Sequence, residues 1–204
     1  MSVTARKMSA RGHEVAGALP ETPFLAVDLD VLERNIARLT RTIIRDGGKN
    51  WRPHVKAIKT PAIAHMLLRA GAIGITCAKL SEAEVMAEAG IREILIANQI
   101  VTPRKIERLA FLNRDAQVLA AVDSLANVEL MGRIAAACGA TIPLVIEVDI
   151  GMHRAGVAPG NDVVTLARAV AAQDHVRFAG VMGWEGGSSW SRSHARQRPQ
   201  TRFQ

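Results

Sequence analysis

Lys56 is the residue of this sequence best placed for covalent chemistry. It ends a short β-type stretch, 51–56, inside the segment RPHVKAIK at residues 52–59. A side-chain amine can form an imine with a carbonyl compound, and burial lowers the pKa of such an amine toward the neutral, nucleophilic form. A lysine that emerges at a rim with its charge in water fits the same spacing, so the pattern alone leaves both interpretations open. His54 lies two residues earlier and shares the strand face of Lys56.

A second candidate group lies in the segment DIGMHRAG at residues 149–156, which follows another β-type stretch. Gly151 and Gly156 flank His153 and Arg154 in what we expect to be a strand-to-helix loop. Glycine allows the backbone to approach a ligand closely, and a guanidinium can bind an anion or a ring oxygen. A turn that carries a surface arginine is the alternative interpretation.

Trp184 ends a further β-type stretch, in the segment GVMGWEG at residues 180–186. An indole at this position can stack on a planar cofactor, or it can cap a hydrophobic core. Polar or aromatic residues close most of the predicted strands, namely Lys56, Lys79, Asn98, Asp123, Asp149 and Trp184.

Seven β-type stretches must position these residues, and amphipathic helical patterns separate them. Several are continuous apolar runs, which is typical of parallel strands buried on both faces. Asp30 and Glu33 are expected to cap the first helix, which Gly47 and Gly48 end. The predicted strands cover residues 24–29, 51–56, 74–79, 93–98, 117–123, 143–149 and 176–183.

This alternation predicts a parallel α/β protein. An open, doubly wound sheet would carry a GxGxxG fingerprint after its first strand, and the sequence has neither this motif nor a Walker A motif. We therefore predict a (β/α)8-type (TIM) barrel, in which the C-terminal ends of the strands carry the chemistry. Such barrels need about 250 residues, so a chain of 204 residues predicts a barrel that is incomplete at its C-terminus.

Composition distinguishes the two terminal segments from the rest of the chain and argues against nucleic-acid binding and a membrane span. Residues 1–21 hold no apolar signal segment and are expected to be a disordered extension. Residues 187–204 form a basic low-complexity tail, either a frameshifted or truncated reading frame or a native disordered tail. The net charge is +7, and removing the four tail arginines leaves +3, so we expect no nucleic-acid partner. No apolar run is long enough for a membrane span, and two separate cysteines favour the cytoplasm.

Together these segments resemble one family. RPHVKAIKTP is similar to the RPHxKxHK segment of D-threonine aldolases and of eukaryotic-type D-serine dehydratases. EVDIGMHRAGV resembles the family's DxGMxRxG loop, and GVMGWEG resembles its strand next to the cofactor ring. These families belong to the fold-type III enzymes that use pyridoxal 5'-phosphate (PLP) and share the alanine racemase N-terminal domain. The resemblance covers residues 22–186, which we expect to form a partial PLP-binding barrel with six barrel strands.

The resemblance implies a role for each candidate residue. Lys56 would be the catalytic residue that forms the internal Schiff base with PLP and moves the α-proton. His54 would lie beside the cofactor, Arg154 would approach the pyridine or its phenolic oxygen, and Trp184 would stack on the ring. The implied activity is that of a PLP-dependent D-amino-acid lyase, which either cleaves D-3-hydroxy amino acids or dehydrates D-serine. The implied partner is a small-molecule D-amino acid.

The chain departs from the family in two respects. Ile58 replaces the second histidine of the motif, and the phosphate-binding loops and metal-carrying domain of full-length relatives have no counterpart. The resemblance implies a divalent metal and a homodimer for full-length relatives, but the metal ligands are absent here and the dimer contacts involve the missing half. Two alternatives stay open, a catalytically inactive truncated fragment and a PLP-dependent amino-acid racemase. We expect the 204-residue chain itself to be inactive or poorly folded.

Overall fold

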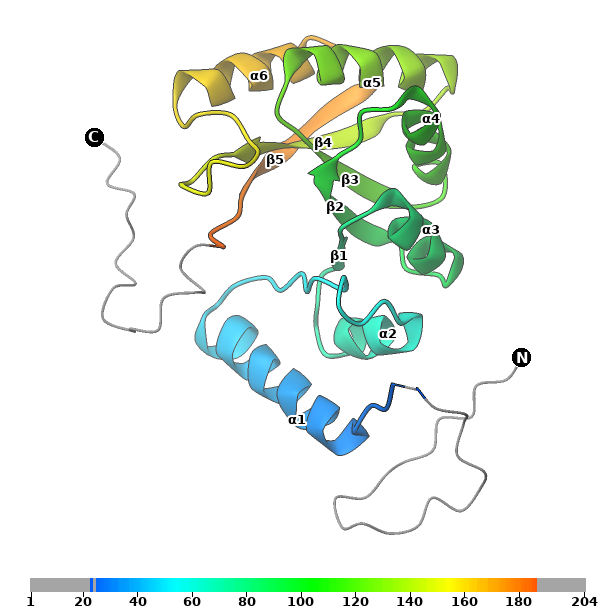
Figure 1. The fold of residues 1–204 in the computed structure, drawn as a ribbon, viewed down its shortest axis with the longest axis vertical. Helices are drawn as coiled ribbons and strands as arrows, with labels where there is room; N and C mark the ends of the chain where they lie inside the picture. The colour runs from blue at the N-terminus through cyan, green and yellow to red at the C-terminus, as the bar shows by residue number, and fades with distance from the viewer. Residues whose placement is uncertain (1–22, 24, 187–204) are drawn as a thin grey trace.

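From residue 75 onward, strands and helices alternate as the hydrophobic pattern predicts (Figure 1). The computed structural model describes residue 23 and residues 25–186. The elements in chain order are α1 (Leu29–Leu39), the π-helix η1 (Thr40–Asp46), α2 (Pro61–Arg69), β1 (Ile75–Cys77), α3 (Leu80–Glu88), β2 (Glu93–Gln99), α4 (Pro103–Leu112), β3 (Gln117–Val122), α5 (Leu125–Ala137), β4 (Ile142–Val148), α6 (Asn161–Ala171) and β5 (Val176–Gly183).

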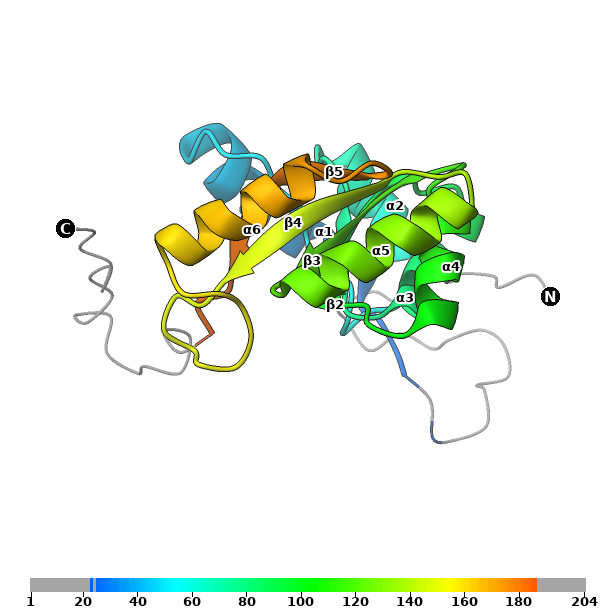
Figure 2. The same ribbon diagram turned by 90° about the horizontal axis from the view of Figure 1, so that it is seen from above.

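The strands form one parallel sheet in the order β1-β2-β3-β4-β5, the same as their order in the sequence. A doubly wound sheet reverses its order at a switch point, and this sheet has no reversal. In Figure 2, helices α3–α6 follow one another along the same side of the sheet. The parallel β/α fold class is therefore confirmed, and the described residues contribute five strands of it.

In β2, alternate residues bury against these helices, whereas β1 and β4 are buried at consecutive residues. Ile94 and Ile96 of β2 are fully buried, whereas Leu95 between them is only half-buried on the opposite face. The buried residues of β1–β4 join those of α3–α6 in a single hydrophobic cluster. A second, smaller cluster joins α1 to α2 and contains Trp51. The covered face thus holds the core, and the opposite face presents the polar strand ends discussed below.

Two predicted strands are wrong. Residues 25–28 form no strand, because the Asp28 carboxylate accepts a hydrogen bond from the Val31 amide at 2.9 Å and starts α1 there. The predicted cap at Asp30 is therefore displaced by two residues. The stretch 51–56 is extended but makes only one bridge, His54 with Thr76 of β1. The hydrogen bonds of Val55 and Pro53 to Thr76, both 2.8 Å, still hold this stretch at the sheet edge.

Other predictions concern residues outside the described part, namely the disordered extension at 1–21 and the basic tail at 187–204. The boundaries of a barrel domain at 22–186 stay a prediction. Within the described residues, no helix combines the length and the apolar character that a bilayer crossing requires.

Candidate functional site

Lys56, Arg154 and Trp184 come together at one end of the sheet, although they belong to three separate chain segments. The Lys56 Nζ atom lies 5.7 Å from the centroid of the Trp184 indole. The Arg154 guanidinium carbon lies 4.4 Å from the same centroid. Both distances are within the range of cation–π contacts. Three of the four predicted site residues therefore share one locus, while their chemical roles stay predictions.

Hydrogen bonds at the edge of the sheet fix the position of Lys56. Val55 is fully buried and donates its amide to the Thr76 carbonyl, so the side chains on either side of it, His54 and Lys56, point away from the core. The Lys56 amide donates to His54 Nδ1 at 3.2 Å. Both side chains are exposed, so of the two interpretations that the pattern left open for Lys56, the described residues agree with a lysine at the rim.

His54 is held toward its neutral form. Although much of the residue is exposed, partial desolvation of its imidazole lowers the pKa, and the positive charge of Lys56 lowers it further, while the Glu82 carboxylate and a backbone hydrogen bond at Thr76 act in the opposite direction. A neutral imidazole keeps a free ring nitrogen to accept the Lys56 amide hydrogen bond. His54 therefore orients the backbone at Lys56 and keeps a second positive charge away from it.

The loop that carries Arg154 is closed at its base. After β4, the Asp149 amide donates to the Val157 carbonyl and the Val157 amide donates to the Glu147 carbonyl, both at 2.9 Å. Gly156 fits inside this closure with φ +101°, and a Cβ atom there would lie 2.6 Å from the Asp149 nitrogen. Only glycine allows this approach, which explains one of the two glycines of the motif.

Asp149 organises the rest of the loop. Its carboxylate accepts hydrogen bonds at 3.0 Å from the amides of His153 and Gly151 and contacts His153 Nδ1 at the same distance. These hydrogen bonds lower the pKa of Asp149, with the His153 amide making the largest contribution. They also hold His153 in a left-handed conformation, φ 51°, and so set the direction in which Arg154 leaves the loop.

The register of β5 brings Trp184 to this loop. Gly183 pairs with Val148, so Trp184 follows β5 beside the start of the loop. A Cβ atom on Gly183 would lie 3.1 Å from the Ile150 side chain, and Gly186 packs directly against the indole. Trp184 is 41% exposed, which leaves part of the ring open to a ligand.

Three polar side chains form a hydrogen-bonded cluster at the ends of β2, β3 and β4, and the sequence did not predict these contacts. Gln99 Nε2 donates to Asp123 Oδ2 at 3.1 Å and to Glu147 Oε2 at 2.6 Å. Asp123 Oδ2 also accepts the Gly156 amide at 3.1 Å and so ties the Arg154 loop to β3. A register shift between Ile96 and Gln99 in β2 aims Gln99 at both carboxylates. Only Asp123 was among the predicted strand-end residues, although Glu147, a carboxylate within a buried apolar strand, was a visible signal.

The small cavity beneath Arg154 and Trp184 has a volume of about 10 Å³. That is room for about one water molecule and not for a pyridine ring. Lys56 does not line this cavity, and its amine lies on the exposed side, 5.7 Å from the indole centroid. Among the described residues, no group of three or more His, Cys, Asp or Glu side chains is arranged to hold a metal ion.

Comparison with known proteins identifies the family. The profile of the alanine racemase N-terminal domain matches residues 27–204, so the chain belongs to this family. The predicted resemblance and fold are therefore confirmed.

Its relatives include lyases of hydroxylated amino acids. The chain is 33% identical over 192 residues to a 3-hydroxy-D-aspartate aldolase of Paracoccus denitrificans, which covers 88% of the chain and 49% of the relative. It is 33% identical over 169 residues to a D-threo-3-hydroxyaspartate dehydratase of a Delftia species, which covers 82% and 44%. The solved structure of D-threonine aldolase from Filomicrobium marinum has a TM-score of 0.76 and 42% identity, over 79% of this chain and 43% of that one. The chain thus spans about half the length of these relatives or less.

Proposed function

We propose that the chain is the cofactor-binding part of a PLP-dependent lyase that acts on D-3-hydroxy amino acids. The observation that carries this proposal is the convergence of Lys56, Arg154 and Trp184 at the ends of parallel strands. A primary amine, a guanidinium and an indole are the groups that an aldehyde, a phenolate oxygen and an aromatic ring require, so the residues present fit the aldehyde and the ring of PLP. When bound, PLP withdraws electrons from the amino acid at its α-carbon.

Each of the four candidate residues would have its own role in holding the cofactor. Lys56 holds the cofactor through its side-chain amine and can accept and return a proton at that nitrogen. Arg154 offers a positive charge next to the indole of Trp184. Trp184 presents its exposed ring as a flat apolar surface for a pyridine ring. His54 stays neutral and orients the Lys56 backbone.

The polar cluster of Gln99, Asp123 and Glu147 holds the loop that carries Arg154. Asp123 holds the Gly156 amide, and Gln99 holds Asp123, so the position of the Arg154 loop depends on β2 and β3 as well as on β4. Fixing a charged group before ligand arrives reduces the conformational entropy lost on binding. The cluster therefore acts as a positioning network for Arg154.

The relatives favour cleavage or dehydration of hydroxylated amino acids over racemisation. Two relatives are aldolases by name and one is a dehydratase, all of them at 33–42% identity. The neighbouring alanine racemase of Clostridium difficile is 18% identical and supports the fold alone. The proposed substrates are therefore D-amino acids with a hydroxyl group on the β-carbon, and the activity is proposed for the whole protein.

The cofactor test uses the 204-residue chain with PLP. We expect an absorbance band near the visible edge that is lost in Lys56→Ala and kept in Lys59→Ala. Lys59 is a matched control, since it is exposed, three residues away and paired with Glu82 at 3.3 Å. D-threonine should change the band and L-threonine should not.

Product analysis separates the alternatives. Glycine with acetaldehyde from D-threonine indicates an aldolase, pyruvate with ammonia from D-serine indicates a dehydratase, and L-alanine from D-alanine indicates a racemase. An equal change of the band with D- and L-threonine contradicts the proposed preference for D-amino acids. A 204-residue chain that holds PLP at Lys56 but yields none of these products is an inactive fragment, whereas their absence from the whole protein contradicts the proposed lyase.

A further inference from the structure

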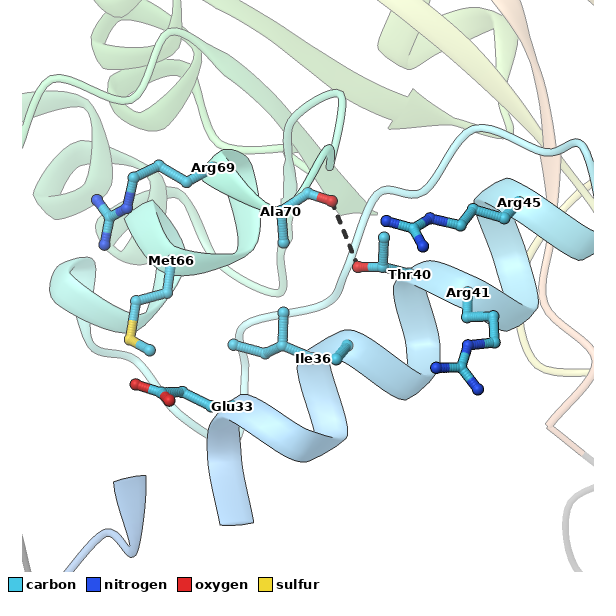
Figure 3. A pocket seen from close by; sticks show the side chains of 9 residues that line it. Glu33, Ile36, Thr40, Arg41, Arg45, Met66, Arg69 and Ala70 are labelled. Atoms are coloured by element: carbon cyan, nitrogen blue, oxygen red, sulfur yellow. Dashed lines mark hydrogen bonds between the residues drawn. The ribbon is translucent and has the colours of Figure 1, made fainter. Parts of the chain in front are cut away.

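A groove between the first two helical segments lies apart from the Lys56 site. It has a volume of about 620 Å³, within the range of small-molecule pockets. Figure 3 shows its walls, formed by α1 and η1 on one side and by α2 on the other. The lining residues named in the argument are Glu33, Ile36, Arg41, Arg45, Met66 and Arg69.

The groove has a fixed apolar floor. Ile36 is buried and belongs to the cluster that joins α1 to α2, and Met66 packs against the same cluster. The Thr40 hydroxyl donates to the Ala70 carbonyl at 3.3 Å and ties the two walls together. The spacing between the helices is therefore set by packing and by a hydrogen bond, and a ligand does not have to create it.

Three arginines border this floor, and all three are exposed. Among the described residues, no hydrogen bond or ion pair is made by the side chain of Arg41, Arg45 or Arg69. Cations near helix C-termini are favourable, which accounts for Arg69 and Arg45. That effect does not account for Arg41, one turn earlier, or for a cavity between the helices.

The backbone of η1 gives independent support. Arg41 and Arg45 both lie on its seven-residue π-helical stretch. π-Helical turns are rare and occur frequently at functional sites. The Lys56 site makes no use of this stretch.

We propose that this groove binds a phosphorylated small molecule. Guanidinium groups bind phosphate oxygens through paired hydrogen bonds, which is the chemistry that Arg41 and Arg45 offer at one end. Ile36 and Met66 contact the apolar part of the ligand. Glu33, at the end of the groove near Met66 in Figure 3, accepts a hydrogen bond from the far end of the ligand. The positive end and the acidic end thus fix one orientation.

ADP is the probe for this proposal, because it combines phosphates with an apolar ring and an amino group. Isothermal titration of the 204-residue chain should show binding of ADP, with adenosine and inorganic pyrophosphate each at least about tenfold weaker. The variant Arg41→Ala/Arg45→Ala should weaken ADP binding by about tenfold or more, because hydrogen bonds to charged groups are lost. Arg38→Ala is the matched control, since Arg38 is an exposed arginine of α1 that does not line the groove, and it should bind ADP as the parent does.

Four outcomes overturn the proposal. If ADP does not bind at millimolar concentrations, the groove is not a site for a phosphorylated small molecule. Equal binding of pyrophosphate and ADP shows only general attraction of anions. Undiminished binding by the double variant, with circular dichroism showing it folded, places the ligand elsewhere. Polyglutamate that binds more tightly than ADP identifies an acidic protein segment as the occupant instead.

Discussion

The Arg154 guanidinium carbon lies 4.4 Å from the centroid of the Trp184 indole, in the geometry of a cation–π contact. Arg154 comes from the loop after β4, and Trp184 follows the neighbouring strand β5. Since Gly183 pairs with Val148, the contact is a direct consequence of strand register. The sheet therefore brings a charge and a ring together next to the Lys56 amine.

Replacing Arg154 should weaken PLP binding without unfolding the chain. We expect Arg154→Ala to reduce the affinity about fivefold, since an exposed contact between a guanidinium and a phenolate oxygen contributes about 1 kcal/mol. Arg154→Lys keeps the charge but loses the planar face and should lie between the two. Absorbance titration with PLP measures the effect, and Arg168→Ala, an exposed arginine on α6, is the control. Unchanged affinity in Arg154→Ala would show that the guanidinium does not contact the cofactor.

The closed loop after β4 should depend on Gly156 more than on Gly151. Both glycines have positive φ values, but a Cβ atom on Gly156 would clash with the backbone at Asp149 and Val148, and one on Gly151 meets nothing within 4 Å. Gly156→Ala should lower the free energy of unfolding by about 3 kcal/mol or more, and Gly151→Ala by about 1 kcal/mol. Chemical denaturation compares them, and equal losses would mean that the loop is not closed as described.

The two cysteines should differ in reactivity. Cys77 is fully buried on β1, and burial raises the pKa of its thiol to about 12, so the reactive thiolate is scarce at neutral pH. Cys138 is only half-buried at the end of α5. An aromatic disulfide reagent should modify one thiol quickly in the folded chain and the second only in denaturant. In Cys138→Ser, a fast-reacting thiol would contradict the burial of Cys77.

His54 should titrate below its ordinary value of 6.5. Because its pKa is lower in the folded chain than in the unfolded chain, the unfolded chain takes up the proton first as the pH falls. The free energy of unfolding should therefore decrease from about pH 6.5 down to the folded pKa. NMR titration of the imidazole measures the midpoint, and Lys56→Ala should move it upward by removing a nearby positive charge. A midpoint at or above 6.5 in the parent chain would disagree with this environment.

The sequence indicated which residues lie near one another but not what supports them. The rule that chemistry sits at the C-terminal ends of parallel strands gave a longer set of candidates, and the family resemblance narrowed it to Lys56, Arg154 and Trp184, whose roles stay predictions. Gln99 could not be found in this way, because its contacts depend on a register shift in β2 that no local pattern specifies. The stretch at 51–56 has the composition of a strand, but a strand is defined by its neighbours, and it makes a single bridge.

The start of α1 could not be predicted to the residue, because the sequence offers two possible N-caps close together. Asp28 and Asp30 are both acceptable caps by residue type, and the backbone at Asp28, which is extended, decided between them. Whether Lys56 is buried or lies at the rim could not be decided from the sequence for a different reason. The face of the sheet that it shares is not covered in the described residues, and exposure depends on all the elements that pack there.

Borohydride reduction of the PLP-treated chain, followed by peptide mass spectrometry, tests the central claim most directly. Reduction makes the bond between the cofactor and its lysine permanent, so the modified residue can be read from the peptide. The account predicts stoichiometric modification of Lys56 and little at Lys59 or Lys79, which are also exposed. Modification spread evenly over the exposed lysines, or undiminished in Lys56→Ala, would contradict the assignment of Lys56 as the cofactor lysine.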